Sequence, residues 1–463
     1  MSGDGPEGFL AVSPATITTR SLLSRHRTVL FRSLAAVVIA LTSTSCSAPP
    51  KPSPPRSRVR AQNPTVRVGL ETGLRQVRIE GNRLRGQMGT VRKTTLLGLS
   101  FVFAARGAEF RVDNGGRMTT GQRTICVADG PIKINGKPYR GAVEILATPD
   151  GITVVNELAV EAYLRGVVPK EIGDLGPREF EAVKAQAIAA RTYTLSYLGR
   201  RADLGFDLWD DTRDQVYDGL TAETTSANRA VAETRGVVIA HNGGLVQSYF
   251  HSTCGGSTVN MSDVWPAENR RFVSQILDRD EAGWYCQKSH HFRWTEVYSA
   301  ARLKQILNRH LKREMESVPG DVGRVLNVVA EATAPSGRVQ ATTITTERGR
   351  FSIPKERVRW VLRRPIDGEP ILRSSYVRYF VDADSEGKLA RLMVSGAGNG
   401  HGIGMCQTGA AEMARRGYSS QQILAHYYQD SELQKWPNIE GVGAPTEATG
   451  PHGIGDLSYR PDR

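Results

Sequence analysis

The sequence contains no apolar run long enough to cross a membrane as a helix, no repeat array and no Walker-type phosphate loop. The apolar run nearest the N-terminus, at residues 34–41, has eight residues, whereas a spanning helix needs about 20. The glycine-rich stretch at 396–409 has no window that satisfies G-x-G-x-x-G. These absences disfavour a membrane span at 34–41, a repeat architecture and a nucleotide-binding loop.

Acidic residues are scarce relative to basic ones. The chain has 47 Asp and Glu against 60 Lys and Arg, a net charge of +13. An acidic partner is therefore expected, and charge alone leaves nucleic acid, an anionic membrane face and an anionic cell-wall polymer open. A hydrophobic content of 40% over 463 residues is typical of a globular protein with two or three domains.

The N-terminus has the pattern of an export segment, which we expect to span residues 1–46. Four arginines at 20–32 precede the apolar run, and the small residues of "TSTSCSAPP" follow it. Cys46 stands where a bacterial lipoprotein would be processed, although Ser43 replaces the usual large aliphatic residue. The protein is predicted to be exported to the cell envelope, either anchored through a lipid on Cys46 or released by simple cleavage. Residues 47–64, rich in Pro and Ser, predict a stiff linker.

The rest of the chain predicts an α+β fold, with a β-rich N-terminal part followed by a domain of mixed strands and helices. Residues 65–142 hold short β-branched segments separated by turn residues, which predicts a small β-rich region. A short helix from about residue 160 is expected to end before Pro169, and a longer one follows Pro177. Residues 434–463 are rich in Gly and Pro and predict a flexible tail.

Two local signals are more specific. Asn242 and Gly243 predict the turn of a β-hairpin. Ser419 and Gln422 suit a capping box at the start of a helix, and Gly417 is expected to close the helix before it.

Four cysteines follow Cys46, and an oxidising compartment allows three pairings among them. They are Cys126, Cys254, Cys286 and Cys406. A Cys254–Cys286 disulfide is the preferred interpretation, because it would close a loop of about 30 residues and add ~3 kcal/mol by the chain-entropy model. A structural zinc site is the alternative, since H-x2-C and C-x3-H offer four residues of suitable type: His251, Cys254, Cys286 and His290.

Three blocks stand out in order along the chain. They are "GVVPKEIG" at 166–173 with the helix "EAVKAQAIAARTY" behind it, "SYFHSTCGGSTVNMSDVW" at 248–265, and "GHGIGMCQTGA" at 400–410. Together they resemble the SpoIID/LytB family of bacterial cell-wall proteins. The resemblance covers about 143–433, within which 301–383 is a loosely matched insert. That family includes lytic transglycosylases that cut peptidoglycan glycan strands and enhancers of cell-wall amidases.

The resemblance implies that Glu171 is the catalytic residue and that His251, Ser252, Arg191 and Tyr193 bind substrate. Glu171 is expected in a turn between two helices. Partial burial there would raise its pKa, while Lys170 would lower it if it pointed inward. Arg191 is expected to pair with Glu171 or with a muropeptide carboxylate, and a surface ion pair on its helix is the alternative.

The glycines at 398–404 have a use under this interpretation. Without side chains at alternate positions, the backbone could lie against a bulky glycan. His401 would then be the polar side chain offered to the sugar, and Gln407 could add a second hydrogen bond. A tight packing corner with a structural histidine is the alternative.

A single carboxyl group is enough for a lytic transglycosylase. The C6 hydroxyl of muramic acid attacks its own anomeric carbon and gives a 1,6-anhydro end, so Glu171 can act first as acid and then as base. A hydrolase would need a second carboxylate. The candidates for this second carboxylate are in one acidic loop: Asp210, Asp211 and Asp214. The alternative is that these residues are only part of a solvent-exposed surface loop.

The sequence therefore predicts a peptidoglycan lytic transglycosylase that requires no cofactor. A protein that binds peptidoglycan and enhances a cell-wall amidase without cutting is the alternative. Nucleic-acid binding rests on positive charge alone, and the export segment argues against it.

Overall fold

The computed structural model describes residues 63–89 and 94–436. The predicted export segment, Cys46, residues 47–62 of the linker and the tail from 437 lie outside the described residues. The chain divides into two units, 1–50 and 51–463, and every described residue belongs to the second. Within the described residues, no helix combines the length and the apolar character needed to cross a membrane.

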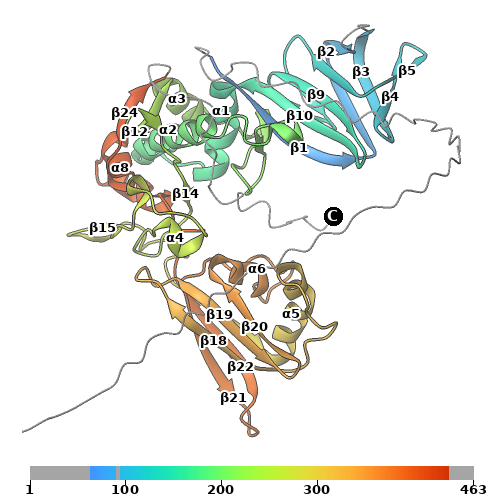
Figure 1. Cartoon of the computed structure of the whole chain (residues 1–463). Helices are drawn as coiled ribbons and strands as arrows, with labels where there is room; N and C mark the ends of the chain where they lie inside the picture. Colours follow the sequence, from blue (N-terminus) through green and yellow to red (C-terminus); the bar gives the residue numbers. More distant parts are fainter. Residues whose placement is uncertain (1–62, 90–93, 437–463) are drawn as a thin grey trace, which may run out of the picture. The chain divides into compact units, whose positions relative to one another are not determined.

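One large sheet forms the β-rich part (Figure 1). Its strands are β1 (Thr65–Leu74), β2 (Gln76–Met88), β3 (Thr94–Arg106), β4 (Glu109–Asn114), β5 (Arg117–Gly121), β6 (Arg123–Val127), β7 (Ile132–Ile134), β8 (Lys137–Tyr139), β9 (Ala142–Thr148), β10 (Gly151–Ala159) and β11 (Leu208–Trp209). The main path runs β11-β1-β10-β9-β6-β2-β3-β4-β5. β9 and β10 lie between β6 and β1, so the sheet continues past the boundary expected at residue 142.

Helices follow directly from β10. They are α1 (Val160–Ile172), α2 (Phe180–Ser196) after the short turn η2 (Pro177–Glu179), and α3 (Thr225–Glu233). The prediction that the first helix ends before Pro169 is wrong, because α1 continues through that proline for one more turn. Proline removes a single backbone bond, and the buried Val167 and Val168 still anchor that turn in the core.

The C-terminal segment of the described chain returns to these helices. It holds β23 (Met405–Cys406), α7 (Gln407–Arg415), α8 (Ser420–Tyr427) and β24 (Glu432–Lys435). β24 pairs with β12 (Val237–His241), so ordered structure extends past residue 434 into the predicted tail. The capping box of Ser419 and Gln422 is confirmed, and so is the hairpin turn at Asn242 and Gly243, between β12 and β13 (Gly244–Leu245).

Short elements connect the helical part. They are η3 (Ala202–Leu204), η4 (Gly219–Ala222), β14 (Phe250–His251), α4 (Met261–Val264), η5 (Arg271–Val273), β15 (Arg279–Asp280) and β16 (Gly283–Trp284). β14 pairs in parallel with β23, and His251 lies opposite Cys406. The second and third sequence blocks are thereby joined in one small sheet.

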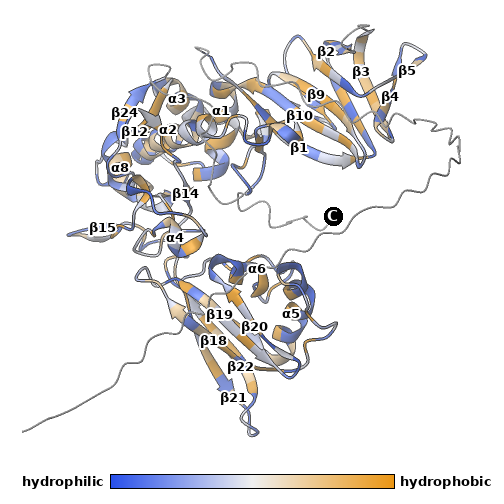
Figure 2. Cartoon of the chain, in the orientation of Figure 1, coloured by the Kyte–Doolittle hydropathy of each residue, from blue (hydrophilic) through white to orange (hydrophobic). Residues whose placement is uncertain are grey.

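Residues 294–396 form a region with a core of its own, wider than the insert expected at 301–383. Its elements are β17 (Trp294–Ser299), α5 (Ala300–Glu314), β18 (Val325–Thr333), β19 (Val339–Thr346), β20 (Gly349–Pro354), η6 (Lys355–Arg357), α6 (Val358–Val361), β21 (Val377–Ala383) and β22 (Leu389–Gly396). α5 buries Leu303, Leu307 and Leu311 on one face, and Figure 2 shows hydrophilic residues along the same helix. The fold is α+β with a β-rich N-terminal part, as predicted.

Candidate active site

Glu171 lies on the last turn of α1 rather than in the turn that follows it, and the residue as a whole is half-buried. Its Oε1 accepts the backbone N–H of Val216 at 2.6 Å, and the side chain of Gln407 donates a second hydrogen bond. Burial raises the pKa of Glu171 to about 7, while these two hydrogen bonds lower it. Lys170 turns away and lies 3.3 Å from Asp218, so the inward-pointing lysine considered above is not present.

Gln407 joins two of the sequence blocks. It is the first residue of α7, and its Nε2 donates to Oε1 of Gln186 on α2 at 3.3 Å. Gln186 is fully buried, and its Nε2 has no hydrogen-bond partner in the described part of the chain. The structure therefore brings Glu171 and Gln407 together, as a shared site requires, with Gln186 beside them.

Arg191 does not pair with Glu171, so that part of the prediction is wrong. Its guanidinium is 1% exposed and binds both carboxylate oxygens of Glu161, at 2.8 and 2.9 Å. The same group also donates to the Val231 and Val237 carbonyls. These contacts fix α1, α2 and the start of β12 against one another, which is an interior role rather than the surface pair considered as an alternative.

Tyr193 is also an interior residue. Its ring packs 4.6 Å from the ring of Tyr197 and 6.0 Å from that of Tyr249. Its hydroxyl donates to Asp214 at 3.1 Å. The predicted contact of Tyr193 with substrate has no support in this geometry, because the side chain is covered by the protein.

The four glycines at 398–404 adopt positive φ, from 68° at Gly404 to 102° at Gly400. Protein atoms, rather than open space, lie where their side chains would be. A Cβ on Gly398 would lie 2.7 Å from the Thr253 carbonyl oxygen, and one on Gly400 would lie 2.9 Å from the Cβ of His251. The glycines therefore form the packing corner named above as the alternative, and the face expected to receive a glycan is occupied by the chain itself.

His401 is held in that corner. Its Nδ1 accepts the Ile403 N–H at 3.1 Å, and its ring lies 5.1 Å from Trp265 and 5.5 Å from His251. Burial, followed by the charges of Arg338 and Arg359, lowers the pKa of His401 to about 3, so the imidazole is neutral at physiological pH.

His251 and Ser252 lie against the same loop. His251 is buried, and its Nδ1 contacts the Ile403 carbonyl at 3.1 Å. The Ser252 carbonyl accepts from the backbone N–H and the hydroxyl of Thr408, which fixes the first turn of α7. Two polar atoms here, Nε2 of His251 and Nε1 of Trp265, have no hydrogen-bond partner among the described residues.

The acidic loop does not supply a free pair of carboxylates. Asp214 accepts from Tyr193 and from the Trp209 N–H, and Asp211 is paired with Arg213. Burial, followed by the charge of Asp211, raises the pKa of Asp210 to about 7. Of the three, Asp210 remains the candidate for the second carboxyl group that a hydrolase would need.

Neither expectation for the cysteines matches the geometry. Cys254 and Cys286 are free thiols whose Sγ atoms lie 3.4 Å apart, longer than the ~2.05 Å of a disulfide. The histidines of the predicted zinc set lie elsewhere, since His290 is exposed and stacks on His291. Cys126 is buried in the large sheet, apart from the other three.

Several site residues were missed by sequence reasoning. Gln186 and Trp265 stand inside the quoted blocks, but their residue types alone gave no signal. Val216 contributes through its backbone N–H, which no sequence pattern marks. Asp278, which lies beside Cys254, belongs to no block at all.

Comparison with known proteins finds two domain models and several similar proteins. Residues 148–241 match the family model described as Stage II sporulation protein, and 245–404 match one described as a domain of unknown function. The stage II sporulation protein D of Bacillus subtilis is 27% identical over 65% of this chain and 84% of its own length. An uncharacterized protein of Brachyspira hyodysenteriae is 28% identical over 66% of this chain and 75% of its own length.

The amidase enhancer of Bacillus subtilis is also similar, at 28% identity over 66% of this chain. The match spans only 45% of that protein's own length. The match to the Stage II sporulation protein model contains the first block with Glu171, and the second match contains the block at 248–265 and the start of the block at 400–410. These findings support the resemblance to the SpoIID/LytB family and locate a SpoIID domain at 148–241.

Proposed function

We propose that this protein acts on the bacterial cell wall as a lytic transglycosylase, which cleaves peptidoglycan glycan strands to 1,6-anhydro-muramic acid ends. The observation that carries the proposal is the Glu171 carboxyl, whose pKa burial raises to about 7 and which accepts hydrogen bonds from the Val216 N–H and the Gln407 side chain. A group with a pKa near neutrality can both give and take a proton during one turnover. No charged partner is needed to account for that pKa, because burial is its largest cause.

The proposed reaction moves one proton out and one proton back. Protonated Glu171 donates to the glycosidic oxygen as the bond from the muramic acid C1 breaks. The C6 hydroxyl of the same sugar then bonds to C1 and gives its proton to the Glu171 carboxylate. The acid is regenerated, no water is consumed and no cofactor takes part.

The partly exposed residues of the third block and its neighbour are the candidates for sugar contact. His401 is partly exposed and neutral, and Ser252 is partly exposed beside the same loop. Gln186, His251 and Trp265 are buried, so in this proposal they support the site from within. Gln407 orients Glu171. The net charge of +13 suits an anionic wall polymer.

The second candidate is a peptidoglycan-binding enhancer of a cell-wall amidase, which the name of the Bacillus subtilis relative favours. Both functions need the protein outside the cytoplasm. We therefore also propose export by way of residues 1–46, with lipid attachment at Cys46 as one route to the membrane.

The test is incubation of the full chain with glycan strands stripped of stem peptides, followed by mass spectrometry. We expect anhydro-ended products, and Glu171→Gln should lower their rate of formation about 100-fold or more. Asp174→Asn is the matched control, since it removes an exposed carboxyl three residues away and should leave the rate unchanged.

Two outcomes decide against the proposal. Products that carry ¹⁸O from labelled water would identify a hydrolase and direct attention to Asp210. A complete lack of products, combined with stimulation of an amidase that Glu171→Gln retains, would establish the enhancer.

A further inference from the structure

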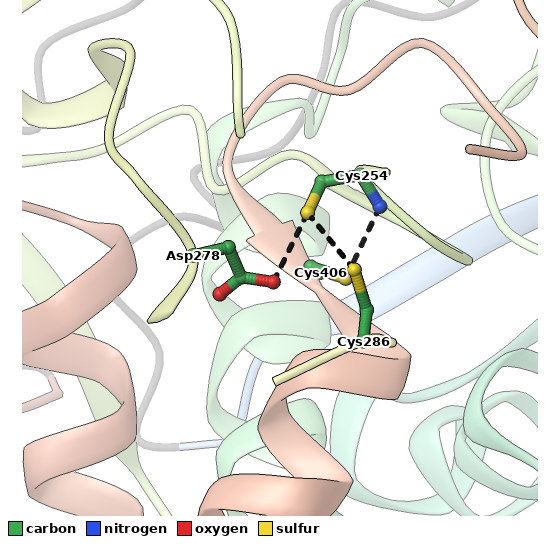
Figure 3. Close-up of side chains that lie close together, drawn as sticks. All are labelled: Cys254, Asp278, Cys286 and Cys406. Carbon is green, nitrogen blue, oxygen red and sulfur yellow. Dashed lines mark hydrogen bonds between the residues drawn. The ribbon is translucent and has the colours of Figure 1, made fainter. Parts of the chain in front are cut away.

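Four buried side chains from separate segments converge behind the glycine loop (Figure 3). They are Cys254, Asp278, Cys286 and Cys406. Their Sγ and carboxylate oxygen atoms all lie within 4.8 Å of one another. None of the four residues has any exposed surface, so the cluster is closed off from solvent.

The spacing suits a tetrahedral metal ion. An ion with metal–sulfur bonds of about 2.3 Å holds its sulfurs about 3.8 Å apart. The Sγ atoms of Cys254 and Cys286 lie 3.4 Å apart, and Cys254 Sγ lies 3.0 Å from Oδ2 of Asp278. Small shifts of side chains would therefore centre an ion among the four atoms.

Backbone N–H groups point at the sulfurs. The Gly256 N–H donates to Cys254 Sγ at 3.2 Å. The Cys254 N–H donates to Cys406 Sγ at 3.2 Å, and the Gly409 N–H donates to the same sulfur at 3.3 Å. Such donors stabilise thiolates, which are the forms that bind metal, and the bond from Gly409 is also the N-cap interaction of α7.

The carboxylate of Asp278 is held so that one oxygen faces the sulfurs. Its Oδ1 accepts the Tyr427 hydroxyl at 2.7 Å, while Oδ2 faces Cys254. Gly409 permits this approach, because a Cβ there would lie 2.6 Å from Oδ2 of Asp278. A ligating carboxylate oriented by an outer hydrogen bond is the arrangement found at protein metal sites.

We propose that Cys254, Asp278, Cys286 and Cys406 bind one zinc ion in a closed, structural site. Three thiolates and one carboxylate are donors that zinc accepts in tetrahedral geometry, and four protein ligands leave no open position for a substrate. A disulfide would use two of the three sulfurs, and it would not account for the buried carboxylate of Asp278 beside them.

The site ties together segments up to 152 residues apart in the chain. Cys406 directly precedes Gln407, whose side chain donates to Glu171. Zinc would therefore fix the start of α7 and, if the proposed function holds, the orientation of the catalytic acid. Only this consequence rests on the proposed function.

The test measures metal directly on the full chain, purified without chelators. Inductively coupled plasma mass spectrometry should give about one zinc ion per chain. Protein reconstituted with Co²⁺ should show thiolate-to-cobalt charge-transfer absorption and the intense visible bands of a tetrahedral ion. Cys286→Ser and Asp278→Asn should each lower zinc content or affinity at least about 10-fold.

Cys126→Ser is the matched control, because it removes a buried cysteine of the large sheet and should leave zinc content unchanged. A measurement on wild-type protein tests the proposal even if a variant fails to fold. Zinc-loaded wild type should resist thiol alkylation at Cys254, Cys286 and Cys406 until a chelator is added. A metal-free protein with a disulfide among these cysteines, or zinc retained in both variants, would overturn the proposal whatever the glycan assay shows.

Discussion

At the scale of single residues, the pKa of Glu171 depends on the absence of cationic side chains next to its carboxylate. Lys170 is held 3.3 Å from Asp218, and Arg191 is committed to Glu161. Among the described residues, the donors that reach the carboxylate are neutral: the Val216 N–H and the Gln407 side chain. A cation at the same distance would keep the group ionised at neutral pH and remove its use as an acid.

The raised pKa of Glu171 also predicts a pH-dependent stability. Folding favours the protonated form, so its contribution is complete below the ordinary value of 4.5 and is lost as pH rises through about 7. Glu171→Gln removes this loss. The free energy of unfolding of the variant, relative to wild type, should increase by on the order of 2 kcal/mol between about pH 5 and about pH 8. Urea denaturation across this range measures it, and parallel pH profiles for the two proteins would contradict it.

The sequence predicted that Glu171 and Gln407 share a site, because two long motifs carried both residues. It could not predict the partner of Arg191. Glu161 and Glu171 both lie on α1, ten residues apart, and which one meets α2 at that point depends on how the two helices cross. The spacing of residues along one helix does not determine the angle at which two helices cross.

At the scale of elements, the glycine loop shows what residue type can and cannot indicate. The alternating glycines correctly indicated backbone dihedral angles that other residues rarely adopt, since all four have positive φ. Whether a ligand or the protein fills the adjacent space depends on segments distant in sequence, such as 249–253. The same dependence explains α1, where packing of Val167 and Val168 outweighs the local preference of Pro169.

Gly404 gives a prediction for this loop. An alanine there would need φ near 68° and would clash with the Tyr249 carbonyl oxygen. Gly417 has φ 89° with nothing within 4 Å of the position that an alanine methyl would take, so it isolates the backbone effect alone. We expect Gly404→Ala to lower the free energy of unfolding by about 3 kcal/mol or more, and Gly417→Ala by about 1 kcal/mol. If chemical denaturation showed the same loss of unfolding free energy for both variants, the loop would be able to accommodate the alanine methyl without an added steric cost.

At the scale of the whole molecule, the region 294–396 has its own core and still reaches the candidate site. One of its contacts is Arg338, a fully buried side chain that donates to the Gly400 carbonyl at 3.2 Å, and Trp294 Nε1 donates to the Gly398 carbonyl at 2.8 Å. The loose match of this region to the family concealed that link. The sequence placed Cys254 and Cys286 together, but it could not add Asp278 and Cys406 to the proposed zinc site, because their proximity arises only from the complete fold.

Arg338→Met tests this link through His401. Arg338 is the second cause, after burial, of the lowered pKa of His401, so its removal should raise that pKa from about 3 toward, but not to, 6.5. Glu356 keeps its pair with Arg359, which limits the cost of the substitution. Histidine-selective NMR should show the His401 imidazole beginning to titrate at a higher pH than in wild type. Arg350→Met, at an exposed arginine of the same region, is the control and should cause no shift. An unchanged His401 titration in Arg338→Met would mean that Arg338 does not lower the pKa of His401, and would leave burial and Arg359 as the causes.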